Sequence, residues 1–125
     1  MLKYIIMLGS AFLLSSTVLA KNYQFNNTAI LQGKVLIIKS LHPNPQFHGG
    51  KQPAIALNQQ VTVEDEDGQI KTKLIQLISS DSAAYSKLFK NNGKNITVTC
   101  DSLFRAETGH HTTKVLCDAN HIHYR

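Results

Sequence analysis

The sequence predicts a mainly β domain: a five-stranded Greek-key barrel of the oligonucleotide/oligosaccharide-binding (OB) type with one helix, in the order β-β-β-α-β-β. Runs of β-branched and aliphatic residues recur between turn signals, and one stretch with helical spacing precedes the last two strands. The length of 125 residues allows one domain. An α+β sandwich is the alternative fold for the same pattern.

Four apolar runs precede the expected helix. Gly33 lies inside the first run and predicts a bulge or a sharp bend. Asp65-Glu66-Asp67-Gly68 predicts a turn rather than a calcium loop, because the spaced oxygen ligands and the final Glu of such a loop are missing. The expected strands are Ala29–Ser40, Ala54–Leu57, Val61–Glu64 and Ile70–Ile78.

The expected helix begins near Ser80 or Asp81, either of which can cap it, and ends at Asn92-Gly93. Its apolar residues recur at helical spacing. Two further strands, Asn95–Cys100 and Thr113–Ile122, are expected to pair across a loop.

The first twenty residues have the layout of a secretory signal. Lys3 precedes an apolar stretch, and Val18-Leu19-Ala20 precedes polar Lys21. Polar residues interrupt the apolar stretch, which argues against a membrane-spanning helix of about 20 apolar residues. We therefore expect cleavage after Ala20, a periplasmic or secreted protein that is not membrane-embedded, a loose leader over 21–28 and a single domain over 29–125.

The charge balance favours acidic partners over nucleic acid. The chain has 13 basic and 8 acidic residues, and loss of Lys3 with the signal leaves 12 and 8, a net charge of +4. Because the basic residues are scattered, no nucleic-acid partner is expected. An exported protein meets neither ATP nor reduced nicotinamide, and no glycine-rich phosphate loop is present.

Two cysteines lie in the last two expected strands. Their midpoint falls between Thr108 and Gly109, so in a symmetric hairpin Cys100 and Cys117 oppose one another. Opposed residues with Cα atoms about 4.5 Å apart can form a disulfide. We expect a structural disulfide worth about 3 kcal/mol. Two buried free thiols are the alternative, while the C-x-x-C spacing of redox thiols is missing.

Two loops are the candidate binding regions, because loops on a rigid scaffold commonly carry recognition. We expect a protein partner in the cell envelope to contact them. A transition-metal site (Zn, Cu or Ni) formed by His110, His111 and Glu107 is a second interpretation, with His42 or His48 as further donors, although adjacent histidines are more simply solvent-exposed. The candidate partner-binding residues are His42, Phe47, His48, Phe104, Arg105, His110 and His111.

The C-terminal third resembles the bacterial domain of unknown function 4431 family. The resemblance covers about thirty residues of the segment 92–122 and follows a GK-x-V-x-V strand, an LF pair, a histidine-containing loop and a VL strand. The matching residues are Asn92-Gly93-Lys94, Ile96 to Thr99, Leu103-Phe104, Ala106, Thr108, His110-His111-Thr112 and Val115-Leu116. The resemblance implies export, and because some relatives of this type resemble, or are joined to, a lysozyme-inhibitor-like domain, it also implies a binding or inhibitory module.

The departures from the family pattern affect two expectations. Glu107 and Thr112 stand where the pattern has histidines, which weakens a metal role. Cys100 and Cys117 replace a glycine and an aliphatic residue, and the gain of both supports the disulfide.

Three functions are therefore compared. The first is an exported binding module that inhibits, or confers immunity to, an envelope-targeting enzyme such as a peptidoglycan hydrolase. The second is metal binding, in which Zn or Cu would be the cofactor; otherwise no cofactor is expected. The third is glycan binding on the barrel face. We expect no enzymatic activity, because no nucleophile motif or convergent acid–base pair is recognised. The candidate stacking aromatics for a glycan are Tyr23, Phe25, Tyr85, Phe89, Phe104 and Tyr124.

Overall fold

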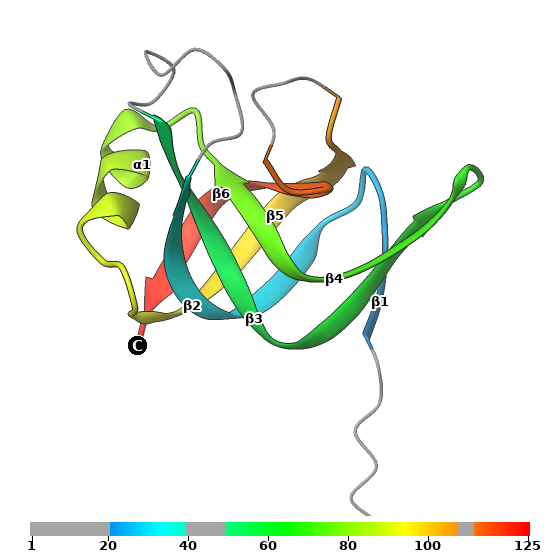
Figure 1. Cartoon of the computed structure of the whole chain (residues 1–125), viewed down its shortest axis with the longest axis horizontal. Helices are drawn as coiled ribbons and strands as arrows, with labels where there is room; N and C mark the ends of the chain where they lie inside the picture. The colour runs from blue at the N-terminus through cyan, green and yellow to red at the C-terminus, as the bar shows by residue number, and fades with distance from the viewer. Residues whose placement is uncertain (1–20, 40–49, 108–111) are drawn as a thin grey trace, which may run out of the picture.

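The computed structural model describes residues 21–39, 50–107 and 112–125, which form a twisted barrel with one helix beside it (Figure 1). Within these residues no helix is long and apolar enough to span a membrane. The elements are β1 (Lys21–Gln24), β2 (Ala29–Lys39), β3 (Lys51–Asp65), β4 (Gly68–Ile78), α1 (Ser82–Phe89), β5 (Asn95–Arg105) and β6 (Val115–Tyr124).

The barrel is closed by five of the described strands. They follow the order β3-β2-β5-β6-β4, and β4 pairs again with β3 to close the ring. All of these pairings are antiparallel except β4 with β6, which is parallel. The helix lies between β4 and β5 in the chain, so the order β-β-β-α-β-β of an OB-like barrel is confirmed.

β3 differs from the expected pair of short strands. The runs Ala54–Leu57 and Val61–Glu64 belong to one long strand, and the register with β4 shifts between Ala56 and Val61. The first part of β3 pairs with β2, and the last part pairs with β1. A bulge of this kind bends a strand, which a small barrel needs at its corners.

Gly33 lies where β2 and the bent β3 come closest. A Cβ atom on Gly33 would stand 2.1 Å from the backbone oxygen of Ala56, a distance that no side chain can occupy. The glycine predicted to mark a bulge or a sharp bend thus permits a close backbone approach at the end of the β2–β3 ladder, where Gly33 stands opposite Leu57.

β1 lies within the segment that the sequence predicts to be a loose leader. Lys21 to Gln24 pair in parallel with Val61 to Glu64 of β3. The backbone then turns through Asn26, which has a φ of 67°. The polar side chains of this segment do not predict a strand. β1 forms because β3, after its bend, presents a free edge with which β1 can pair.

α1 is capped as the sequence predicts. The Asp81 carboxylate accepts hydrogen bonds from the backbone N–H groups of Ala83 and Ala84, at 3.0 and 3.2 Å. Leu88 is the fully buried residue of the helix and packs into the barrel core. Each of the five barrel strands contributes inward-facing apolar residues to the core, including Leu31, Ile55, Ile75, Ile96 and Cys117.

The Cys100–Cys117 disulfide joins β5 to β6, with Cα atoms 5.3 Å apart. The prediction that these residues oppose one another directly is wrong. Cys100 stands opposite Ala119 and Cys117 opposite Leu103, because the register shifts twice between Thr99 and Leu103. Diagonal neighbours are ordinarily about 7–8 Å apart, so the irregular ladder brings this diagonal pair to bonding distance.

Candidate functional site

A buried cluster of glutamine and threonine side chains lies where the β2–β3 loop returns to the barrel. Gln52 at the start of β3 and Gln76 near the end of β4 are 1% and 3% exposed. The Thr112 hydroxyl donates a hydrogen bond to Oε1 of Gln52, and the Thr112 backbone N–H donates to Oε1 of Gln76 over 2.8 Å. The Gln76 backbone N–H in turn donates to Oγ1 of Thr113 over 2.9 Å.

This cluster joins the bases of the two predicted binding loops. Gln52 follows the first loop, and Thr112 follows the second, so the hydrogen bond between them links segments 60 residues apart in sequence. Buried polar groups are costly unless they are hydrogen-bonded, and these bonds therefore hold the strand ends in one arrangement. The structure does not describe five of the predicted loop residues, which lie in 40–49 and 108–111: His42, Phe47, His48, His110 and His111.

The remaining predicted loop residues are described. Phe104 is half-buried in β5, opposite Leu116 of β6. Glu107, the third candidate metal ligand, is exposed just beyond the end of β5. Within the described residues, no three His, Cys, Asp or Glu side chains are grouped around a common metal position.

The side chain of Arg105 contacts other residues of the protein. Its guanidinium donates to Asp65 Oδ1 over 2.8 Å and to the Gly68 carbonyl oxygen over 3.0 Å, and it lies 4.4 Å from the centre of the Phe25 ring. The hydrogen bond from Arg105 lowers the pKa of the Asp65 carboxyl, so this carboxylate is charged at neutral pH. Arg105 thus holds the β3–β4 turn against the end of β5, a role that the sequence prediction of partner binding did not include.

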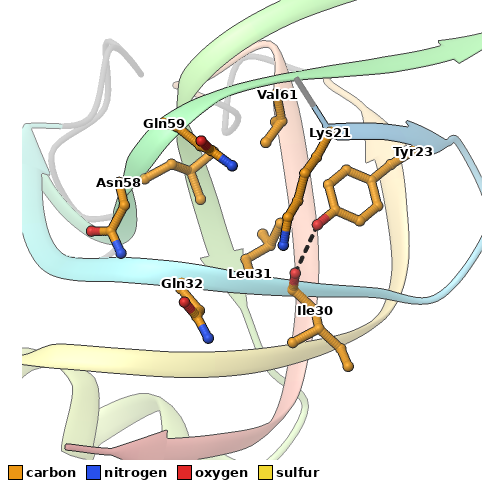
Figure 2. A pocket seen from close by; sticks show the side chains of 9 residues that line it. Lys21, Tyr23, Ile30, Leu31, Gln32, Asn58, Gln59 and Val61 are labelled. Atoms are coloured by element: carbon orange, nitrogen blue, oxygen red, sulfur yellow. Dashed lines mark hydrogen bonds between the residues drawn. The ribbon is translucent and has the colours of Figure 1, made fainter. Parts of the chain in front are cut away.

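A cavity of about 240 Å³ opens between β1, β2 and β3 (Figure 2). The β2–β3 ladder stops at Gly33 and Leu57, and β3 turns away to pair with β1, which leaves this space. Its floor is apolar, and its rim carries the amides of Gln32, Asn58 and Gln59 with the ammonium group of Lys21.

Tyr23 forms one wall of this cavity. Its hydroxyl donates to the Ile30 carbonyl oxygen over 2.9 Å, which fixes the ring between β1 and β2. Burial raises the pKa of Tyr23, so the hydroxyl remains a donor at neutral pH. Ile30 itself is 56% exposed.

The other candidate aromatics have internal contacts. Phe25 is buried in the core. Tyr85 and Phe89 pack edge to face on α1, with ring centres 5.3 Å apart. Lys87 places its ammonium group 4.7 Å from the Tyr124 ring centre. Of the predicted stacking residues, Tyr23 is therefore the one that lines the cavity.

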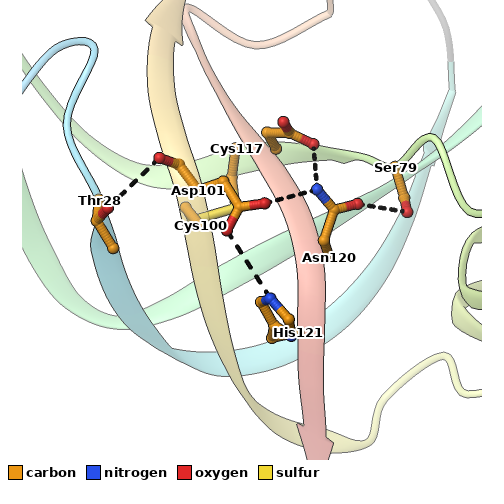
Figure 3. A network of polar contacts seen from close by, with 8 residues as sticks. Thr28, Ser79, Cys100, Asp101, Cys117, Asn120 and His121 are labelled. Atoms are coloured by element: carbon orange, nitrogen blue, oxygen red, sulfur yellow. Dashed lines mark hydrogen bonds and ion pairs between the residues drawn. A yellow bond between two sulfur atoms is a disulfide. The ribbon is translucent and has the colours of Figure 1, made fainter.

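A polar network occupies the irregular part of the β5–β6 ladder (Figure 3). The Asn120 side-chain amide donates to Asp101 Oδ2 over 2.7 Å and to Asp118 Oδ1 over 3.1 Å. Ser79 donates its hydroxyl proton to Oδ1 of Asn120 over 3.2 Å, which connects β6 to the residue after β4. Asn120 thus bridges the two carboxylates.

Comparison with known families adds one finding. Residues 74–123 match the model of a family described as domain of unknown function (DUF4431). The resemblance to DUF4431 is confirmed. The DUF4431 segment runs from the second half of β4 to β6 and includes α1, the disulfide, the Asn120 network and most of the buried glutamine–threonine cluster. No curated protein matches the chain.

Sequence reasoning missed Gln52, Gln76 and Asn120. Each is a neutral amide within a strand, and such residues carry no motif of their own. The position of Gln76 could have indicated its role. It interrupts a run of apolar residues near the end of β4, where both faces of the strand are buried. An amide at such a position indicates a polar partner from another segment.

Proposed function

We propose that the protein is an exported binding module of the cell envelope that contacts a protein partner through its β2–β3 and β5–β6 loops. The observation that carries this proposal is the Gln52–Thr112 hydrogen bond, which joins the bases of both loops on the barrel. A loop whose ends are already fixed loses less conformational entropy on binding than a free one. The layout of the first twenty residues supports export.

The partner proposed here is an envelope-targeting enzyme such as a peptidoglycan hydrolase, which the protein inhibits or to which it confers immunity. The net positive charge favours an acidic surface on that enzyme. A disulfide-linked barrel suits an oxidising compartment, where disulfides persist.

An inhibition assay tests this function. The tag-free protein, exported and purified from a periplasmic fraction, is added in molar excess to glycosidase, amidase and endopeptidase classes of wall hydrolase, and clearing of a cell-wall suspension is followed. We expect inhibition of at least one class. Absence of inhibition, together with absence of binding to every enzyme by surface plasmon resonance, would overturn the proposal.

Two matched threonine variants test the role of the loop bases. Thr112→Val removes the hydroxyl that binds Gln52, whereas Thr97→Val removes a hydroxyl from the outer face of β5. One hydrogen bond contributes about 1 kcal/mol, so Thr112→Val should weaken inhibition by about fivefold. The Thr97 variant should inhibit like the wild type. Equal inhibition constants for the two variants would contradict the role of the cluster.

The cavity of Figure 2 favours a second function, the binding of an acidic glycan. A tyrosine ring, three amides and one ammonium group around an apolar floor are groups that bind a sugar ring, its hydroxyls and a carboxylate. Heteronuclear NMR titration with neutral and carboxylated oligosaccharides tests it. Shifts confined to this cavity and abolished by Tyr23→Leu, but retained in Tyr85→Leu, would support the proposal; shifts that persist in Tyr23→Leu would refute it.

A further inference from the structure

The outer face of the β5–β6 pair carries two exposed histidines that neither proposed function uses. His121 and His123 are separated by one residue in β6. Side chains at this spacing in a strand project from the same face, with Cα atoms about 6–7 Å apart. Both histidines are exposed, and the side chain of His121 is 73% accessible.

Small residues keep this face open. Thr99 stands opposite His121 and Thr97 opposite His123 in the β5–β6 ladder. Together with Asn120 and Ile122 these side chains line a shallow hollow of about 410 Å³. Both imidazoles therefore have room to rotate toward one point above the sheet.

A carboxylate lies beside the histidine pair. Oδ1 of Asp101 is 4.0 Å from Nε2 of His121 (Figure 3). Nitrogen and oxygen ligands bind zinc-sized ions at about 2.0–2.2 Å, so two donors of one ion can stand up to about 4.2 Å apart. The observed separation is thus within the span that a single ion can bridge.

The Asn120 network holds this carboxylate in place. Asn120 donates to Oδ2 of Asp101, which leaves Oδ1 directed toward His121. The same amide also donates to Asp118, so a second carboxylate lies on the other side of Asn120 from the contact with Asp101. This local charge favours a cation even though the chain as a whole is basic.

We propose that His121 and His123, with Asp101 as a third donor, bind one divalent transition-metal ion, and that Cu²⁺ binds more tightly than Zn²⁺ or Ni²⁺. Imidazole and carboxylate donors suit all three ions, and the order of affinity for such donors places Cu²⁺ first. The described side chains are not already grouped around one metal position, so the imidazoles rotate into place as the ion binds. The site is separate from both loops and from the cavity between β1 and β2.

Isothermal titration calorimetry of the tag-free protein with CuCl₂ tests this site, and electron paramagnetic resonance reports the number of coordinating nitrogens. We expect one Cu²⁺ per chain with two nitrogen donors. His121→Ala and His123→Ala should each weaken binding by at least about tenfold, since even residues that only support metal ligands contribute this much. Asp101→Asn should weaken it less, because both imidazoles remain.

The matched control is the double variant His110→Ala/His111→Ala, which removes two histidines from the loop and leaves β6 intact. It should bind Cu²⁺ like the wild type. Binding that survives both strand variants, or that is lost in the loop variant, would overturn the proposal, as would the absence of binding by the wild type. Because the His121 and His123 variants leave both loops and the Gln52–Thr112 hydrogen bond unchanged, hydrolase inhibition by these two variants is independent of the metal result.

Discussion

Reduction of the Cys100–Cys117 disulfide is expected to lower the free energy of unfolding by about 3 kcal/mol. The bond closes a loop between residues 17 positions apart, and the chain-entropy relation for a loop of this length gives about 3 kcal/mol at 25 °C. Both cysteines are fully buried, so the reduced thiols stay within the core and retain most of their packing. For a domain of this size, the loss corresponds to a fall in Tm of about 12–24 °C.

Urea unfolding followed by far-ultraviolet circular dichroism measures this change, with and without a phosphine reductant. The double variant Cys100→Ala/Cys117→Ala is the control, because its stability should not respond to the reductant. It should also be less stable than the reduced wild type, since two buried sulfur atoms are removed. A loss below about 1 kcal/mol on reduction would refute the reasoning that loop closure dominates.

Three further changes test the fold. Gly33→Ala should destabilise the protein in urea unfolding, because its Cβ would overlap the Ala56 backbone oxygen; stability equal to that of the wild type would contradict this close approach. Leu88→Ala should cost about 2–5 kcal/mol in the same assay by leaving a void between α1 and the barrel, and a cost below about 1 kcal/mol would contradict the burial of this side chain. The lowered pKa of Asp65 means that its charged form stabilises the fold above about pH 4 and that this stability is lost as pH falls through the folded-state pKa. Asp65→Asn should therefore be less stable than the wild type at pH 7, and the difference should shrink as pH falls through the lowered folded-state pKa; a difference independent of pH would show that the Arg105 contact acts without charge.

Local elements followed from local chemistry. Asp81 caps α1, and the turn at Asp65 to Gly68 joins β3 to β4, as their residue types predict. Asp65 accepts a hydrogen bond from the Asp67 backbone N–H, and Gly68 has a φ of 129°. These signals are reliable because cap and turn conformations depend on a few adjacent residues.

Pairings between distant segments were harder to predict. Two expected strands merge into β3, and β1 adds to its far end. Both features depend on the bend of β3 opposite Gly33, and closing the barrel is what requires this bend. The cysteine pairing was correctly expected, but its diagonal register was not. A hairpin drawn from sequence is symmetric, whereas the register of the real ladder shifts twice beside the Asn120 network.

For the candidate sites too, local features could be predicted from the sequence, whereas contacts between distant segments could not. Histidines and loop residues can be recognised from the sequence because their side-chain chemistry is distinctive wherever they lie. The link between Gln52 and Thr112 and the position of Asp101 beside His121 join residues that have no local relation. The sequence by itself determined the strand and helix order, the barrel class, the cysteine partners and the resemblance to DUF4431, since composition, periodicity and short motifs carry these. Only the tertiary structure decided the register, the cavity and the polar clusters, because each depends on the way in which closing the barrel brings distant strands together.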